Sequence, residues 1–222
     1  MKLQPQSTVG VPFGSASPVL GFNSDSATLH ERTDIGCVLL TAAVDSVTIA
    51  APASAAAAVE LPLTPGKFKR GAGPRRTALW LSPRSWLIHC GIEEDTKLST
   101  SLNASFPDKL VHAVPFTDHL CWFELSGPGS LDLLTEGTFL SLEPGGLPIG
   151  HTKRALIAQV AAIFVRESDT VWLIAVERSR ARYFADWLSA AATSPIQPAP
   201  GAPGPGLRHA WKGSWSGLDQ PR

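Results

Sequence analysis

The sequence predicts an α+β fold in which antiparallel strands pack against helices. Between residues 31 and 192, pairs of short apolar or alternating segments are separated by single amphipathic helical segments. The last strand pair is followed directly by a helix, and Pro, Gly and Ser are frequent at both ends of the chain. We therefore expect a flexible arm at residues 1–30, one α+β domain at 31–192 and a Pro/Gly-rich tail at 193–222.

The first part of the domain is expected to hold two strand pairs around one short helix. The helix is an alanine-rich stretch within residues 50–58, where Pro52 restricts the position of the first turn. The expected strands are Gly36–Thr41, Val44–Ile49, Thr77–Leu81 and Ser85–Cys90.

The middle of the domain continues with helix, strands and helix. Three carboxylates at residues 93–95 complement the positive end of a helix dipole, which predicts a helix reaching about Asn103. The turn Ser126-Gly127-Pro128 introduces a second helix. The remaining expected elements are strands at Leu110–Phe116 and Leu120–Leu125 and the helix at Gly129–Thr135.

A hairpin and a final helix are expected at the end of the domain. Residues 152–165 are apolar and compatible with a strand, a turn follows at residues 167–169, and Val171–Val176 returns antiparallel. Ser179 is the expected N-cap of the last helix. The apolar face of that helix is predicted to consist of Ala181, Phe184, Trp187, Leu188 and Ala191.

Composition and charge exclude several classes of protein. Nineteen Lys and Arg balance nineteen Asp and Glu, which leaves no electrostatic footprint for nucleic acid or an anionic membrane. No apolar run is long enough to span a membrane. The charged fraction of 17% is below the roughly 25% usual for soluble domains. Part of that deficit reflects the Ala, Pro and Gly that are frequent in the tails, and the other part, with seven tryptophans, fits a surface covered by other proteins.

The three cysteines, Cys37, Cys90 and Cys121, lie in apolar runs and show no Cys-x-x-Cys spacing. We expect them to be buried thiols in a reducing compartment. The first residues show no secretory signal, so the expected location is cytoplasmic.

A basic patch is formed by Lys67, Lys69, Arg70, Arg75 and Arg76 among glycines and a proline. It is either a grip on an acidic partner surface or a phosphate, or a solvated loop. The phosphate-loop pattern Gly-x-x-x-x-Gly-Lys-Ser/Thr is absent.

No segment carries a complete catalytic, dinucleotide-binding or metal-binding pattern. Ser126 stands at a strand–helix turn without the Gly-x-Ser-x-Gly elbow, so its glycines are interpreted as turn geometry. Only two of the three glycines of the dinucleotide motif occur there. The densest group of metal-ligand types, without zinc-like spacing, is His112, Asp118, His119 and Cys121. We predict no catalytic, cofactor-binding or metal site in this chain.

Four residues remain as candidates for an interface or an anion contact. Arg178, beside Ser179 at the junction of hairpin and helix, either clamps a carboxylate or forms a salt bridge next to a helix cap. Trp211 and Trp215, in the tail, either insert into a groove on a partner protein or have no role in binding.

Four local signatures occur in a fixed order along the chain. Together they resemble the gamma subunit family of heterotetrameric sarcosine oxidase, which is related to the folate-binding, aminomethyltransferase-like fold of the glycine-cleavage T-protein. The signatures are Leu79-Trp80-Leu81-Ser82-Pro83-Arg84-Ser85-Trp86-Leu87, Leu125-Ser126-Gly127-Pro128-Gly129-Ser130-Leu131-Asp132-Leu133-Leu134, Leu147-Pro148-Ile149-Gly150-His151-Thr152 and Arg178-Ser179-Arg180-Ala181-Arg182-Tyr183-Phe184-Ala185-Asp186-Trp187-Leu188.

The resemblance implies a non-catalytic, structural gamma subunit that assembles with alpha, beta and delta subunits. Such a complex oxidatively demethylates sarcosine to glycine, releases hydrogen peroxide and passes the one-carbon unit to tetrahydrofolate. FAD, FMN, NAD, tetrahydrofolate and zinc are expected in the partner subunits and none in this chain. Ser141-Leu142 replaces the Asp-Leu pair usual in the family, which leaves the N-methyl amino acid substrate open.

Other functions stay open at this point. One is a stand-alone folate-binding, aminomethyltransferase-like protein, although the chain is short for the whole T-protein architecture. Another is a subunit of a related oxidase for a different N-methyl amino acid. A third is an interaction protein outside flavin metabolism, with the tail tryptophans as its contact.

Overall fold

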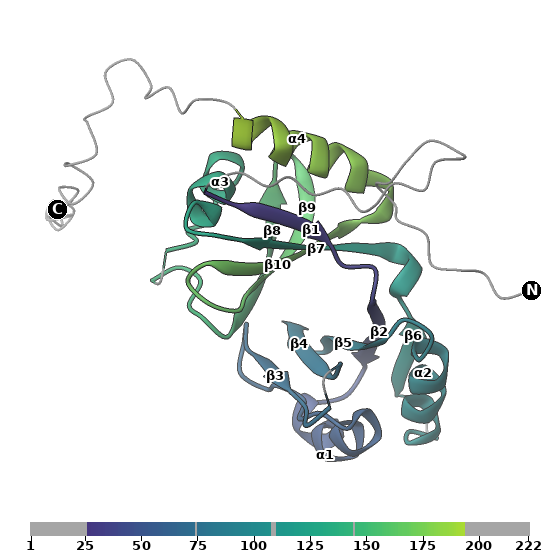
Figure 1. Cartoon of the computed structure of the whole chain (residues 1–222). Coiled ribbons are helices and arrows are strands. Elements are labelled where there is room, and N and C mark those ends of the chain that lie inside the picture. Colours follow the sequence, from purple (N-terminus) through teal and green to yellow (C-terminus); the bar gives the residue numbers. More distant parts are fainter. Residues whose placement is uncertain (1–25, 74, 108–109, 144, 194–222) are drawn as a thin grey trace, which may run out of the picture.

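A computed structural model describes residues 26–193 apart from 74, 108–109 and 144, and it contains two five-stranded antiparallel sheets (Figure 1). Sheet A has the spatial order β1 (Thr28–Glu31), β7 (Leu120–Ser126), β10 (Val171–Glu177), β9 (Val160–Arg166) and β8 (His151–Ile157). Sheet B has the order β3 (Phe68–Arg70), β4 (Thr77–Ser82), β5 (Ser85–Gly91), β2 (Ile35–Ala42) and β6 (Val111–Pro115).

Helices cover the outer face of each sheet, so that the domain has four layers (Figure 1). Against sheet A pack α3 (Ser130–Gly137) and α4 (Ala181–Thr193), and against sheet B pack α1 (Ser46–Ala57) and α2 (Asp95–Ala104). Two 3-10 turns, η1 (Thr117–His119) and η2 (Arg178–Arg180), precede β7 and α4. This arrangement confirms the predicted α+β class with antiparallel strands and packed helices.

Alternation along the central strands divides the apolar side chains between two cores. In β7, Leu120 and Trp122 lie in the layer between the sheets, whereas Phe123 and Leu125 lie in the layer beneath α3 and α4. Successive side chains of a strand point to opposite faces. Because both faces of β7 are covered, the strand reads as a nearly continuous apolar run.

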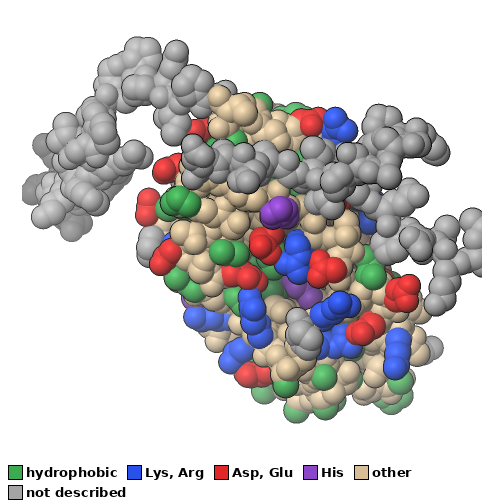
Figure 2. Space-filling model, viewed as in Figure 1, with side chains coloured by type: hydrophobic (Ala, Val, Ile, Leu, Met, Phe, Trp, Pro, Cys, Tyr) green, Lys and Arg blue, Asp and Glu red, His purple; other side chains and the backbone are tan. Residues whose placement is uncertain are grey.

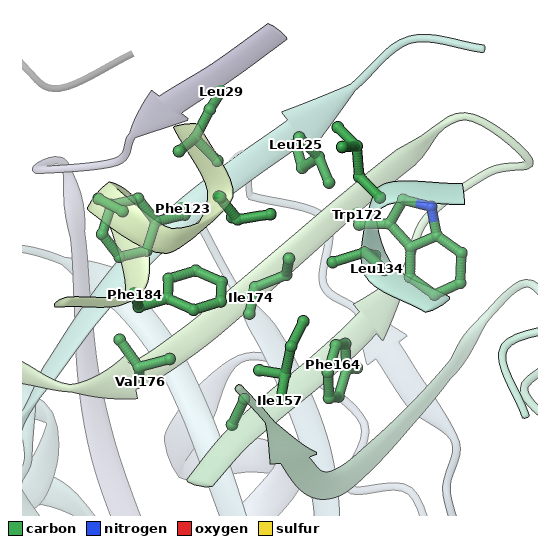
Figure 3. Close-up of a cluster of buried hydrophobic side chains, with 14 of the residues drawn as sticks. Leu29, Phe123, Leu125, Leu134, Ile157, Phe164, Trp172, Ile174, Val176 and Phe184 are labelled. Carbon is green, nitrogen blue, oxygen red and sulfur yellow. The ribbon is translucent and has the colours of Figure 1, made fainter. Parts of the chain in front are cut away.

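The layer beneath α4 is filled by large side chains from all five strands of sheet A (Figure 3). Phe184 of α4 is fully buried there and its ring centroid lies 5.4 Å from that of Phe123. The predicted apolar face of the last helix is confirmed, since Ala181, Phe184, Trp187, Leu188 and Ala191 all belong to this core or pack against it.

The N-terminal boundary of the domain was predicted too late. Residues 28–30 were assigned to a flexible arm, but Thr28–Glu31 form β1, which pairs antiparallel with β7 and buries Leu29 opposite Leu125. Four residues carry too little periodicity to predict an edge strand. Their conformation depends on a partner strand more than ninety residues away in the sequence.

The expected strand at Val44–Ile49 is wrong, because α1 begins at Ser46. The side chain of Asp45 accepts a hydrogen bond from the backbone N–H of Val47 and caps the helix. Pro52 lies inside α1, further along than expected. The alternating apolar residues that suggested a strand include Ile49, which the helix buries against sheet B.

The segment 152–165 was expected to be one strand and is a hairpin of β8 and β9. Ala158 and Gln159 connect them with φ values of 48° and 64°. Two central residues with positive φ are typical of a type I′ turn, which usually contains Asn or Gly. Since neither residue is present, no local signal marked this turn.

The remaining expected elements are confirmed to within about two residues, with one exception at the last helix. Ser179 lies inside the 3-10 turn η2, and α4 begins at Ala181, so Ser179 is not at the N-cap position. Glu177 and the η2 turn make the transition from β10 instead.

Candidate functional site

The junction between β10 and α4 holds two of the predicted contact residues. Arg178 Nε donates to the backbone carbonyl of Asp118 at 3.0 Å, and its Nη2 lies 3.7 Å from the Asp118 carboxylate. Ser179 is exposed. Arg178 therefore links this junction to η1, and the exposed ion pair contributes little because solvent screens it. The role of both residues in an interface or an anion contact stays a prediction.

The other two predicted contacts, Trp211 and Trp215, lie outside the described residues. Arg166, which is buried, has a structural role. Its Nη1 donates to the carbonyls of Leu142 and Leu147, and its guanidinium lies 5.0 Å from the ring of Trp172. It holds the segment before β8 against the edge of sheet A.

The thiols are buried, as predicted. Burial raises the pKa of Cys37 to about 12 and that of Cys90 to about 11. Cys121 is buried and donates to the carboxylate of Glu31 at 3.4 Å. Protonated thiols are poor nucleophiles and poor metal ligands near neutral pH.

The structure does not gather the metal-ligand types that the sequence places between residues 112 and 121. His112 is exposed on β6, and His119 stacks on Phe116 with ring centroids 4.3 Å apart. Within residues 26–193 as described, no three His, Cys, Asp or Glu side chains meet in a group suited to a metal ion. No described helix is long and apolar enough to cross a membrane.

Charged side chains gather in the middle of one face, where the two sheets meet (Figure 2). They surround a cavity of about 130 Å³ that is also lined by Ile35, Thr77, Cys90 and Leu173. We call its polar lining the intersheet cluster, which consists of Arg32, Asp34, Arg70, Arg75, His89 and Glu167.

Ion pairs in the intersheet cluster join the two sheets. Arg32, which follows β1 of sheet A, donates Nε and Nη2 to Asp34 at 2.8 and 2.9 Å, and Asp34 leads into β2 of sheet B. Arg32 also donates a hydrogen bond from Nη1 to the carboxylate of Glu124 on β7 at 2.7 Å. Arg70 of β3 lies 2.6 Å from the carboxylate of Glu167, which follows β9. Arg32 thus forms a bidentate pair with Asp34 and a second pair with Glu124. Together with the Arg70–Glu167 pair, these contacts hold the two sheets together beside the cavity.

The same contacts shift two pKa values. The hydrogen bonds that Arg32 donates to Asp34 hold the pKa of Asp34 below its usual value and raise the pKa of Arg32. Both groups therefore stay charged across the physiological range.

His89 is the buried member of the cluster. It lies on β5 and meets the ring of Trp122 edge-on, with centroids 4.5 Å apart. Burial, with the nearby cations Arg32 and Arg70, lowers the pKa of His89 to about 3. Its Nε2 is buried without a hydrogen-bond partner among the described residues. The imidazole is therefore neutral near pH 7 and retains one unused polar atom.

Acidification is expected to destabilise the domain through His89. Its folded pKa of about 3 is below the ordinary value of 6.5, so the unfolded chain binds the extra proton. The neutral His89 imidazole therefore contributes fully to the free energy of unfolding above pH 6.5, and this contribution is lost as the pH falls below that value. Urea unfolding should show a loss of about 2 kcal/mol between about pH 7.5 and pH 5. Asp34 does not contribute there, because its effect begins below its ordinary pKa of 3.8.

Histidine variants separate this effect from general acid sensitivity. His112→Gln, an exposed change on β6, should keep the pH dependence of the wild type, whereas His89→Gln should reduce it. An NMR titration of the wild-type imidazoles gives the same information if His89→Gln does not fold. A His89 signal that titrates near pH 6.5 would contradict the prediction.

Three members of the basic patch form ion pairs within the chain, and its contact with an acidic partner or a phosphate stays a prediction. Arg70 pairs with Glu167, Lys69 lies 3.1 Å from Glu60, and Arg76 lies 2.9 Å from Glu94. Part of the patch is the strand β3, so it is not only a loop. The sequence identified Arg70 and Arg75 in this patch but missed Arg32, Asp34, His89 and Glu167, because they come from separate segments.

The four-layer arrangement is similar to two solved structures. A chain of heterotetrameric sarcosine oxidase from Corynebacterium sp. U-96, in complex with pyrrole 2-carboxylate, matches with a TM-score of 0.67 and 22% identity, over 75% of this chain and 83% of that chain. Glycine cleavage system aminomethyltransferase T from Bartonella henselae matches with a TM-score of 0.54 and 12% identity, over 73% of this chain and 45% of that chain. The fold is thus of the aminomethyltransferase-like class.

The sequence itself identifies the family. Residues 41–194, more than half of the chain, match the model of the sarcosine oxidase, gamma subunit family. The chain belongs to this family, which confirms the resemblance found from the four signatures. A comparison with curated protein sequences gave no match.

Proposed function

We propose that this chain is the gamma subunit of a heterotetrameric sarcosine oxidase, an oxidoreductase complex that demethylates sarcosine to glycine. The complex releases hydrogen peroxide and transfers the one-carbon unit to tetrahydrofolate. The observation that carries this proposal is the family match over residues 41–194. The fold shared with a chain of a heterotetrameric sarcosine oxidase supports it.

Within the complex, the chain acts as a structural subunit and performs no chemistry itself. The state of its reactive groups supports this role. The thiols of Cys37 and Cys90 have raised pKa values, and His89 is neutral and buried. General acid–base catalysis at neutral pH works best with a group whose pKa is near 7, and His89 is far from it.

Its partners are the alpha, beta and delta subunits, and FAD, FMN, NAD, tetrahydrofolate and zinc reside in them. Exposed apolar side chains on several elements are available for contacts with these subunits. They include Phe139, which is fully exposed, and Leu156 at the edge of sheet A, whose exposed fraction is 60%. Aromatic side chains are enriched and charges are depleted in the centres of protein interfaces, which agrees with the low charged fraction of 17%.

A pull-down of the tagged full-length chain from its native cells tests the proposal. We expect larger chains to co-elute, with flavin absorption in the visible blue, and the eluate to release peroxide when sarcosine is added. A mock purification from cells without the tag provides the control. A colourless chain that elutes alone would argue against the complex, and a folate titration would then test the stand-alone alternative.

The pull-down also tests which N-methyl amino acid the complex oxidises. Peroxide release with another N-methyl amino acid, but not with sarcosine, would keep the subunit role and change the substrate.

A Trp211→Ala/Trp215→Ala double variant tests whether the tail tryptophans anchor the partners. Reduced recovery of the larger chains with this variant, relative to wild type, is the expected result if they do.

A further inference from the structure

Among the described residues, Arg75 is the arginine of the cavity lining that forms no hydrogen bond or salt bridge, and its charge acts on Asp34 from a longer distance. Arg32 and Arg70 are held by carboxylates in hydrogen-bonded ion pairs. Arg75 lines the same cavity, but it has no hydrogen-bond or ion-pair partner among the described residues. It is exposed, so the cavity is open to solvent beside it.

The pairing of the charges around the cavity leaves one guanidinium available for an anion. Arg32, Arg70 and Arg75 line the cavity with Asp34 and Glu167, and Glu124 pairs with Arg32 from outside the lining. Asp34 and Glu167 already accept from Arg32 or Arg70. The cation that remains available is therefore the guanidinium of Arg75, and a guanidinium binds oxyanions through paired N–H groups.

The unused nitrogen of His89 is the second feature that points to a ligand. His89 lines the cavity from β5, and only 6% of the residue is exposed. Buried polar atoms are almost always hydrogen-bonded, so an unpartnered one marks a missing partner. Its pKa is shifted by two cations besides burial, which indicates a positive potential at the ring. A neutral imidazole can donate one hydrogen bond to an oxyanion without requiring a proton from solvent.

The size of the cavity limits the ligand. A water molecule occupies about 30 Å³ in the liquid, and the cavity of about 130 Å³ equals roughly four such volumes. A phosphate ion or a small carboxylate with one or two waters fits this volume, whereas a pterin with its glutamate tail does not. The site is also unlike the larger groove of about 720 Å³ beside α1, which contains no arginine.

We propose that the cavity between the two sheets binds a small oxyanion, of the phosphate or carboxylate type, through Arg75 and His89. The ligand would pair with Arg75, which precedes β4, and accept a hydrogen bond from His89 on β5, so that it would link these two segments. This site does not depend on the proposed role in sarcosine oxidase, and it is tested on the isolated full-length chain.

Isothermal titration calorimetry and thermal melting with inorganic phosphate and with acetate test the site, at constant ionic strength maintained with chloride. We expect saturable binding of at least one of the two anions and a melting temperature that rises with its concentration. The anion that binds more tightly identifies the ligand type. Arg75→Gln should weaken binding at least about tenfold, because it removes a charged hydrogen-bond donor.

Matched variants keep the result interpretable. Arg84→Gln, an exposed arginine in the turn between β4 and β5, removes the same charge elsewhere and should bind like wild type. Arg75→Lys preserves charge but not the guanidinium, and should show intermediate affinity. Saturable binding that weakens only in the Arg75 variants supports the site. Absence of saturable binding by the wild type, or equal binding by Arg75→Gln, would overturn it.

Discussion

Replacement of Phe184 by alanine is expected to lower the free energy of unfolding by about 3–5 kcal/mol. The side chain of Phe184 is fully buried between α4 and sheet A, where it meets Phe123 and the aliphatic side chains around it (Figure 3). The change removes a ring from a close-packed layer and leaves a cavity that the sheet cannot fill. Urea unfolding followed by circular dichroism measures the loss.

The neighbouring aromatic residue on the same helix is the control. Tyr183 has an exposed fraction of 53%, so Tyr183→Ala should change the free energy of unfolding by no more than about 0.5 kcal/mol. A loss below about 1 kcal/mol for Phe184→Ala, or equal losses for the two variants, would show that α4 does not close the core of sheet A.

Replacement of Gly127 by alanine is the second change with a large expected effect. Gly127 has φ of 120°, and a Cβ atom there would lie 2.5 Å from the backbone carbonyl oxygen of Ser26. The unusual dihedral costs about 1–3 kcal/mol for a residue with a side chain. The overlap with the backbone adds about 1–3 kcal/mol. Thermal unfolding should show a melting temperature lower by several degrees or more.

Gly145 provides the matched control, because a Cβ atom there meets nothing within 4 Å. Gly145→Ala is expected to leave the melting temperature nearly unchanged. If Gly127→Ala leaves the melting temperature unchanged, the segment before β1 does not approach the turn before α3 as closely as described. The result bears directly on the motif Ser126-Gly127-Pro128, whose glycine the sequence analysis interpreted as turn geometry.

Local patterns were sufficient for the long elements. The apolar runs of β7 and β10 were predicted because strands covered on both faces are apolar throughout, and the apolar face of α4 was predicted from its helical spacing. The prediction failed where a distant partner or a cap decides the conformation. Asp45 converts an alternating segment into α1, and β7 holds residues 28–31 as a strand.

The candidate site was less accessible from the sequence than the fold. Arg75 was identified within a basic patch, but nothing near it indicated that it shares a cavity with His89. His89 is an ordinary polar residue inside an apolar strand until the second sheet covers it. Its low pKa and its unpartnered nitrogen result from that burial, which no spacing along the chain expresses.

The α+β class, most of the strands and helices, and membership of the sarcosine oxidase gamma subunit family could be predicted before the fold was known. These properties follow from short-range periodicity and from motifs of about ten residues. The folded chain shows in addition that two sheets face each other and that five separate segments surround a charged cavity. The physical reason is that sheet pairing and burial join residues far apart in the chain, and only their packing creates the charges and the unused hydrogen-bonding atom of the site.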